Sequence, residues 1–435
     1  MPKAHFRKTR RQLTSRRVWR TRLVFWSGAV LVGVAATALA VSSDYTGRVF
    51  TRILEISPYI PFVLTPLGLV LITWLTRSFV PSAKGSGIPQ VIAALQMKHN
   101  SDRRKILSLR MALSKGLLVI LGIFSGASIG REGPTVHIAA AITYAMSRIA
   151  RFPLHDIGRG LIIAGAAAGL AAAFNTPLAG IVFVIEEIRR SYEKNTSGTI
   201  LTAVIIAGMT ALTIQGNYQY FGTVTAKLEL SQAVAVVITT GIIGGLAGGL
   251  FGALLLSGTR KLTNFRNTRP YVLALICGLS LAGLGLASGG LTYGTGYEEA
   301  QHLISGGETN GFSYALMKLL ATIISYWSGI PGGIFAPSLS VGAGLGAGIA
   351  DWFPGVPSAA IILLGMVAYF TAVVQTPITA VIIIMEMTAD QSLLLPLMAT
   401  ALIAEGVSKL INPKPIYRQL AMDFMKDVHK KKREE

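Results

Sequence analysis

Long apolar runs recur along almost the whole chain, from Leu23 to Ile411. They are long enough to cross, or to enter and leave, the roughly 30 Å hydrocarbon layer of a bilayer. The composition agrees, because only 14% of the residues are charged, whereas about a quarter are charged in a typical soluble domain. The sequence therefore predicts an all-α polytopic membrane protein in which residues 23–417 form a single membrane domain.

The net charge of +20 is placed as in a membrane protein and not as in a nucleic-acid-binding protein. Basic residues gather in the tails and in loops beside apolar runs, where the positive-inside rule puts them on the cytoplasmic side. The tails at 1–22 and 418–435 and the loops at 103–105 and 260–269 are therefore predicted to be cytoplasmic. The segment 293–311 holds three glutamates and no Lys or Arg, and it is predicted to face outward.

Three short motifs share a spacing of glycine and proline. Glycine allows a tight bend, and proline at the first helical position needs no N–H partner. Each motif therefore predicts a helix that begins inside the membrane, where free N–H groups and the positive end of the helix dipole attract anions. The motifs are Gly85-Ser86-Gly87-Ile88-Pro89, Gly130-Arg131-Glu132-Gly133-Pro134 and Gly333-Ile334-Phe335-Ala336-Pro337. The first leads into a stretch too short to span, which predicts a re-entrant half-helix covered by protein or water.

A degenerate internal repeat divides the chain into two halves. The tripeptides beginning at Asn175 and Gln375 both continue Thr-Pro and lie 200 residues apart, and Glu186 and Glu386 have the same offset. Halves of this kind are typical of transporters, although the count of spans leaves open whether the repeats are inverted. The comparison gives Glu186 a structural role, and it leaves Glu187 without an acidic counterpart.

Glu132 is the strongest candidate functional residue in the sequence. A carboxyl group in an apolar segment can change its charge by binding a proton. It could fill an anion site when charged and leave it when protonated, which would join a gate and a proton carrier. An ion pair with Arg131 is the alternative, but adjacent positions on a helix do not face each other well.

The other polar residues have structural explanations of their own. Serine is common in glycine turns, as at Ser86, and a tyrosine near a membrane end, such as Tyr417, usually lies at the interface. Surface salt bridges with Arg189 and Arg190 are the default explanation for Glu186 and leave Glu187 open. We expect packing or partnered structural roles for the remaining candidates, which are His137, Lys318, Asp390 and Glu405.

No pattern in the sequence indicates an enzyme. The single cysteine, Cys277, excludes a disulfide framework and a cysteine metal site, and the zinc-protease and P-loop motifs are absent. A membrane hydrolase that pairs a serine with His137 is a distant alternative, because no serine stands in a recognisable nucleophile motif. We expect no metal and no cofactor.

The segments GSGIPQ, GREGPTV, GIFAPSLSVGAGLG and KPIY, in this order, resemble the CLC family of chloride channels and chloride/proton antiporters. The resemblance extends from about Leu23 to Tyr417 and implies a helical bundle of inverted repeats with re-entrant half-helices, assembled as a homodimer. It also implies roles for six residues. The hydroxyls of Ser86 and Tyr417 and the backbone N–H groups of Ile334 and Phe335 would bind the anion, Glu132 would be the external gate, and Glu187 would transfer protons internally.

Two further features refine what this resemblance implies. Family channels usually replace the internal glutamate, so the presence of Glu132 and Glu187 favours chloride/proton exchange over a passive chloride channel. Ser86 matches the chloride-selective pattern, with a fluoride-selective member as the alternative, and Gln90 stands where some bacterial relatives carry an acid. Only 18 residues follow Tyr417, so we expect no cytoplasmic regulatory domains and a prokaryotic inner-membrane protein.

Overall fold

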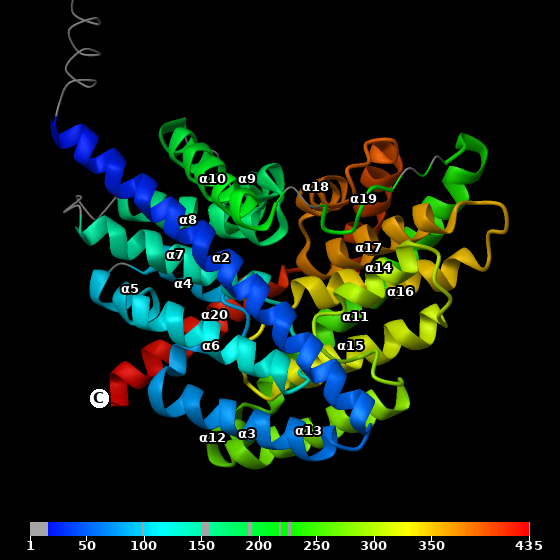
Figure 1. The fold of residues 1–435 in the computed structure, drawn as a ribbon, viewed down its shortest axis with the longest axis horizontal. Coiled ribbons are helices and arrows are strands. Elements are labelled where there is room, and N and C mark those ends of the chain that lie inside the picture. The colour runs from blue at the N-terminus through cyan, green and yellow to red at the C-terminus, as the bar shows by residue number, and fades with distance from the viewer. Residues whose placement is uncertain are drawn as a thin grey trace, which may run out of the picture.

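The computed structural model describes residues 16–97, 99–149, 157–189, 194–216, 219–224, 226 and 228–434. These residues form helices and, apart from two isolated β-bridges, no strands (Figure 1). The first half holds α2 (Arg16–Ile56), α3 (Pro61–Phe79), η1 (Pro81–Ala83), α4 (Ile88–Gln96), α5 (Asn100–Ile106), α6 (Leu109–Phe124), α7 (Glu132–Ile149), α8 (Ile157–Phe174), α9 (Pro177–Phe183), η2 (Val184–Arg189) and α10 (Lys194–Gln215). The second half holds α11 (Leu230–Lys261), α12 (Thr263–Thr268), α13 (Pro270–Ala287), α14 (Tyr297–Ile304), α15 (Gly311–Trp327), α16 (Phe335–Ala350), α17 (Ser358–Val374), α18 (Pro377–Thr388), α19 (Leu394–Ile411) and α20 (Ile416–Glu434).

The helices divide into long spans and short apolar pieces, which confirms the predicted membrane fold class. Within the described part of the chain, seven segments are long and apolar enough to cross a membrane. Shorter apolar helices, such as α16 and α17, lie between them and are buried on almost every side. A short helix can end inside a membrane when protein covers its ends. This arrangement lets helix termini meet at the centre of the bundle.

One predicted loop was wrong, and two apolar runs differ in extent from the helices they form. The apolar run from Leu23 ends at Val41, but α2 continues to Ile56, because its own backbone hydrogen bonds hold it together after the apolar run ends. The apolar run 161–185 is split into α8 and α9. The basic loop 103–105 is part of the short helix α5, and Arg103 in it is buried. Most of the basic tail 1–22, and Arg190, lie outside the described residues.

The two halves repeat each other in backbone conformation. Asn175 has φ 55° and Gln375 has φ 59°, a left-handed conformation that non-glycine residues rarely adopt. Each residue ends one helix, and the Thr-Pro pair after it starts the next, α9 or α18. The same unusual turn at two positions 200 residues apart agrees with the predicted internal repeat.

Two glutamates tie the halves together reciprocally. The Glu186 carboxylate accepts hydrogen bonds from the N–H groups of Ile378 and Thr379 at 3.2 and 2.8 Å, at the start of α18. The Glu386 carboxylate accepts from the N–H groups of Leu178 and Ala179 at 3.0 and 2.7 Å, at the start of α9. These bonds satisfy helix N-terminal donors and place a negative charge at the positive end of each dipole. Glu186 is therefore structural, as its counterpart in the repeat indicated.

Substitution of Glu386 by Gln is expected to lower the free energy of unfolding. The variant loses a charged acceptor for two N–H groups, and a hydrogen bond to a charged group contributes about 1.5–3 kcal/mol. Thermal unfolding of the detergent-purified protein measures this loss. Glu405→Gln is the matched control, because Glu405 pairs only with Lys409 one turn away on the same helix, an interaction of about 0.5 kcal/mol. Equal unfolding temperatures for the two variants would contradict the capping role.

The C-terminal segment 418–435, expected to be a short charged tail, is helical in its described part. Residues 416–434 form α20, which packs against α4 (Figure 1). Leu420, Ala421 and Phe424 are buried on its inner face. This packing fixes the first turn of α20, where Tyr417 lies.

Candidate functional site

The three glycine-proline motifs meet at the centre of the bundle and are joined by backbone hydrogen bonds. Gly85 N–H donates to Ile330 O at 3.1 Å, and Gly332 N–H donates to Gly85 O at 3.2 Å. Gly130 and Gly333 exchange two bonds, N–H to O in each direction, both 2.7 Å long. Segments almost 250 residues apart in sequence are therefore held in one register. The starts of α4, α7 and α16 lie next to one another as a result.

Glycine is required in these motifs for conformation and for space. Gly87 has φ 112°, which L side chains rarely adopt, and it is the residue immediately before α4. A side chain on Gly133 would collide with the Ser86 hydroxyl and would lie 3.1 Å from the Ser86 carbonyl oxygen. The absence of a side chain at Gly133 therefore lets α7 approach the start of α4.

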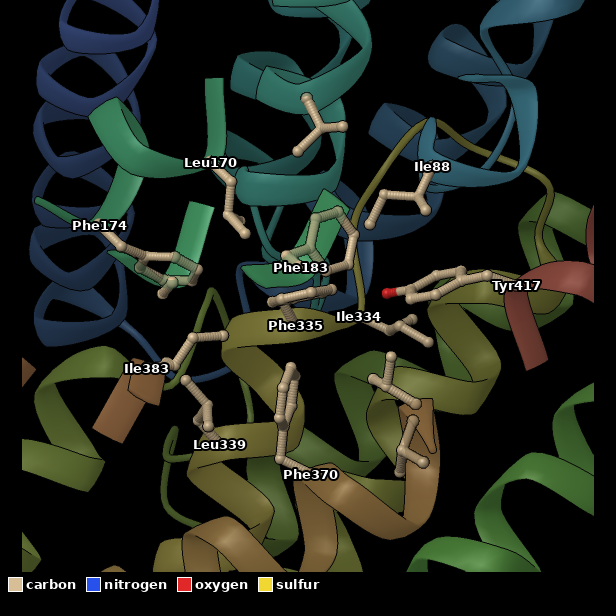
Figure 2. Packing of buried hydrophobic residues seen from close by; sticks show 14 of the residues in the cluster. Ile88, Leu170, Phe174, Phe183, Ile334, Phe335, Leu339, Phe370, Ile383 and Tyr417 are labelled. Carbon is tan, nitrogen blue, oxygen red and sulfur yellow. The ribbon is translucent and has the colours of Figure 1, made fainter. Parts of the chain in front are cut away.

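The hydroxyls of Ser86 and Tyr417 lie beside each other in this buried region. Ser86 is 1% exposed and Tyr417 is 0% exposed, so Tyr417 is not the interfacial residue that its position in sequence usually indicates. Its ring stacks on Phe335 at a centroid distance of 6.1 Å, and Figure 2 shows its hydroxyl pointing toward Phe335 and Ile334. Among the described residues neither hydroxyl donates to a backbone carbonyl. Both can therefore donate to a ligand.

The same point faces the start of α16. Ile334 precedes the helix and Phe335 is its first residue, so the backbone N–H groups here have no partner within the helix. The Phe335 ring is held by Phe370 at 4.7 Å and by Phe183 at 5.6 Å, centroid to centroid (Figure 2). This packing fixes the first turn of α16 without using its N–H groups. The predicted donors Ser86, Tyr417, Ile334 and Phe335 thus come from three separate helices.

Glu132 begins α7 and is completely buried. Its carboxylate lies between Gly130 and the first turn of α16, because a side chain on Gly130 would touch Glu132 Oε2 and lie 3.3 Å from the Ala336 nitrogen. The Ala336 N–H faces this carboxylate. Glu132 therefore already occupies a position where helix N–H groups stabilise a negative charge. The carboxylate fills a place beside the Ala336 N–H, in the same turn of backbone as the predicted donors Ile334 and Phe335.

Arg131 points away from Glu132 and is held by α2. Its Nη1 donates to the Ala40 carbonyl oxygen at 2.6 Å and to Asp44 Oδ1 at 2.5 Å. Among the described residues Arg131 pairs with Asp44 and forms no ion pair with Glu132. Asp44 can reach Arg131 because α2 continues past the apolar run that ends at Val41.

The other end of α4 is held by Arg103 of α5. Arg103 Nε donates to Ala94 O at 3.0 Å, and Nη2 donates to Met97 O at 2.6 Å. These carbonyls lie at the C-terminus of α4, where a cation is also favoured by the helix dipole. Arg103 therefore caps the C-terminus of α4, a helix of only nine residues whose N-terminus lies next to Ser86.

Arg103→Ala is expected to weaken this half-helix. The variant leaves buried carbonyl groups without donors, which should cost about 3 kcal/mol of stability. It should also weaken anion binding, because α4 loses the contact that fixes its position. Unfolding temperature and chloride titration measure the two effects. Arg104→Ala is the control, since Arg104 is exposed, and a variant at Arg103 that matches it would contradict the assignment.

Glu187 lies in η2, a π-helical turn directly after α9. It is completely buried, whereas Glu186 beside it is partly exposed and caps α18. Glu187 is close enough to Tyr417 for its charge to act on the hydroxyl. The two carboxylates therefore have different surroundings, although both residues belong to η2. Glu187 is thus placed on the same buried region as the predicted anion donors.

Two cavities lie near this region. One, of about 640 Å³, reaches Gly85 and Tyr326. Its wall includes one acid, Asp423, which pairs with Arg260, and four basic residues, Lys84, Arg260, Arg266 and Lys426. The other, of about 90 Å³, lies beside Asp44 and the segment from Tyr293 to Glu299. The first cavity lies on the Tyr417 side of the site and the second on the Arg131 side.

The remaining candidates have the structural roles that the sequence indicated. His137 is packed and its Nε2 lies 3.2 Å from the Ile106 carbonyl oxygen. Asp390 accepts from Ser392 N–H at 2.7 Å, and Glu405 pairs with Lys409. Arg103 and Asp44 were not identified as part of the site from sequence. Arg103 lies in a basic run that membrane topology already explained, and no pattern in the sequence marks Asp44.

Broken helices from two related halves that meet at one buried point define a membrane protein of the transporter type. Residues 68–409 match the family model described as voltage gated chloride channel. The H(+)/Cl(-) exchange transporter ClcA of Yersinia pestis bv. Antiqua (strain Angola) is 30% identical over 428 residues, which cover 92% of this chain and 87% of that protein. The chain therefore belongs to the CLC family of voltage gated chloride channels.

Other relatives agree in sequence and fold. The ClcA exchange transporter of Vibrio cholerae serotype O1 (strain ATCC 39541 / Classical Ogawa 395 / O395) is 32% identical over 403 residues, 86% of this chain and 82% of that protein. A slow cyanobacterial Cl−/H+ antiporter of known structure superposes with a TM-score of 0.83 at 25% identity, covering 93% of this chain and 98% of that one. The resemblance seen in the motifs is confirmed, and the relatives are named as transporters and not as enzymes.

Proposed function

We propose that this protein exchanges chloride for protons across the membrane. The observation that carries the proposal is the meeting of three helix starts with the Ser86 and Tyr417 hydroxyls at one buried point, with the Glu132 carboxylate beside it. The exchange-transporter names of its relatives support the same function. Chloride would take hydrogen bonds from the two hydroxyls and from the N–H groups of Ile334 and Phe335.

Glu132 would act as the external gate. When charged, its carboxylate lies at the start of α16 beside the Ala336 N–H, where an anion on its way to the site would also be stabilised. When it binds a proton, the attraction of the helix dipole for it falls, and chloride can take its place. One side chain therefore makes the entry of chloride depend on the binding of a proton.

Glu187 would carry protons between this region and the cytoplasm. It is buried near Tyr417, and α20, the helix that carries Tyr417, also lines the larger cavity. The basic wall of that cavity attracts anions, so chloride would enter from the cytoplasm there while protons use Glu187. With this orientation both tails would lie in the cytoplasm and the segment 293–311 would face outward.

Proteoliposomes test the proposal directly. With equal pH on both sides at the start, an outward chloride gradient should drive protons into the liposomes. A protonophore should abolish the resulting pH difference. Chloride flux without proton movement would identify a passive channel instead. Faster efflux of fluoride than of chloride would identify a fluoride-selective member. We also propose that the protein is a homodimer in a prokaryotic inner membrane. The mass of the detergent complex measures the number of subunits.

A further inference from the structure

Two completely buried lysines occupy equivalent positions in the two halves. Lys115 on α6 and Lys318 on α15 are 203 residues apart, the same offset as Pro134 and Pro337. The glycines before α4 and α14 extend this equivalence, because Gly87 lies against Lys115 and Gly296 lies against Lys318. Both glycines have positive φ, 112° and 79°. The two lysines can therefore be compared contact by contact.

Lys318 is fully compensated. Its Nζ donates to the carbonyl oxygens of Thr292, Tyr293 and Gly294, each at 3.0 Å. Glu299 is close enough for its charge to act on the ammonium group. Three acceptors and an acid are what a buried ammonium needs to remain charged at low cost.

Lys115 lacks these partners. At the equivalent carbonyls, Gln90 Nε2 donates to Lys84 O at 2.6 Å and Gly332 N–H donates to Gly85 O at 3.2 Å. Gln90 itself stands where Glu299 stands in the other half, 209 residues apart, as Gly87 and Gly296 do. Within the described part of the chain, Lys115 Nζ makes no hydrogen bond and no ion pair.

The position of Lys115 links it to the anion site. Its Nζ is 3.0 Å from where a side chain on Gly87 would begin, and Gly87 follows Ser86 directly. His137 and the Gly133 carbonyl oxygen lie at the same place. The ammonium group is therefore separated from the Ser86 side of the site by a single glycine that has no side chain.

We propose that Lys115 is an affinity-determining residue for the anion, and that Gln90 keeps its charge uncompensated. The inference rests on the proposed anion site. An unpaired buried cation is costly unless an anion nearby balances it. Chloride held at Ser86 supplies that balance through space, whereas at Lys318 protein groups already supply it. One copy of the repeated lysine stabilises the fold, and the other attracts the transported ion.

Chloride titration by calorimetry on the detergent-purified protein tests this. Lys115→Met should raise the chloride Kd about tenfold or more, because a unit charge close to a buried anion is poorly screened. Gln90→Glu should also raise it, because the new carboxylate recreates the arrangement of Lys318 with Glu299. Gln90→Met is the comparison, because it frees the same carbonyl without adding a charge, and it should raise Kd less than Gln90→Glu does.

Stability measurements separate the electrostatic role from a structural one. Lys115→Met should unfold at a temperature no lower than that of the unaltered protein, since it removes an uncompensated charge. Lys318→Met should unfold at a lower temperature, because three carbonyls lose their donor, without a comparable change in Kd. A folded Lys115→Met protein with unchanged Kd would overturn the inference, as would equal weakening by Lys318→Met. Failure of the unaltered protein to bind chloride would instead overturn the proposed function.

Discussion

Glu132→Gln is expected to abolish chloride-driven proton movement while chloride still crosses the membrane. Glutamine has the shape of the protonated carboxyl, but it is always neutral and does not bind or release a proton. It therefore cannot carry protons, and it lacks the negative charge that holds the carboxylate at the start of α16. Loss of a group that carries protons typically reduces such transfer roughly 10²-fold or more. The measurement records pH and chloride together in proteoliposomes prepared with a chloride gradient.

A matched carboxylate controls for the change of charge in this experiment. Glu308 is exposed in the segment 293–311, and Glu308→Gln should leave the proton and chloride rates unchanged. Proton movement in Glu132→Gln equal to that of the unaltered protein would remove the gate assignment. Loss of chloride flux together with proton flux would also contradict it, because the vacated donors should still bind chloride.

Glu187→Gln is the second large effect that we expect. Proton movement should fall about as far as in Glu132→Gln, with chloride flux retained, because Glu187 lies near Tyr417 but does not belong to the anion donors. The adjacent Glu186 provides the comparison, since its carboxylate caps α18. Glu186→Gln should lower the unfolding temperature and keep the coupling of chloride to protons, whereas Glu187→Gln should do the reverse.

A Glu187→Gln protein that still moves protons at the original rate would contradict the proton-transfer role of Glu187. Identical behaviour of the two variants would also contradict it, because it would mean that the two neighbouring carboxylates share one role. The distinction depends on the π-helical turn, which buries Glu187 while Glu186 reaches the other half of the molecule.

Much of this site was predictable because its chemistry is local in sequence. Each of the three motifs holds its glycine and proline within five residues, and this spacing is enough to predict a helix start. One of the motifs also contains Glu132. The offset of 200 between the Thr-Pro turns predicted the repeat, and the matching φ angles of Asn175 and Gln375 agree with it. The same offset between Glu186 and Glu386 predicts a structural role for Glu186, which agrees with its bonds to the N–H groups of Ile378 and Thr379.

Contacts between distant segments could not be predicted in this way. Arg103 lies in a run of basic residues whose obvious explanation is membrane topology, and nothing local shows that it reaches back to α4. Asp44 lies beyond the end of the first apolar run, so its contact with Arg131 depends on how far α2 continues. Lys115 and Lys318 have the same apolar surroundings in sequence. They differ in their contacts with other segments, because three carbonyl oxygens accept from Lys318 and, among the described residues, none accepts from Lys115.

Bromide density would test the central claim most directly, because bromide substitutes for chloride and scatters anomalously. Crystals of the unaltered protein and of Glu132→Gln, grown in bromide, should both show a peak between the hydroxyls of Ser86 and Tyr417. The variant should show a second peak beside Ala336 N, where the carboxylate of Glu132 lies. Bromide at neither place, or a second peak equally strong with Glu132 intact, would contradict competition between this carboxylate and the anion.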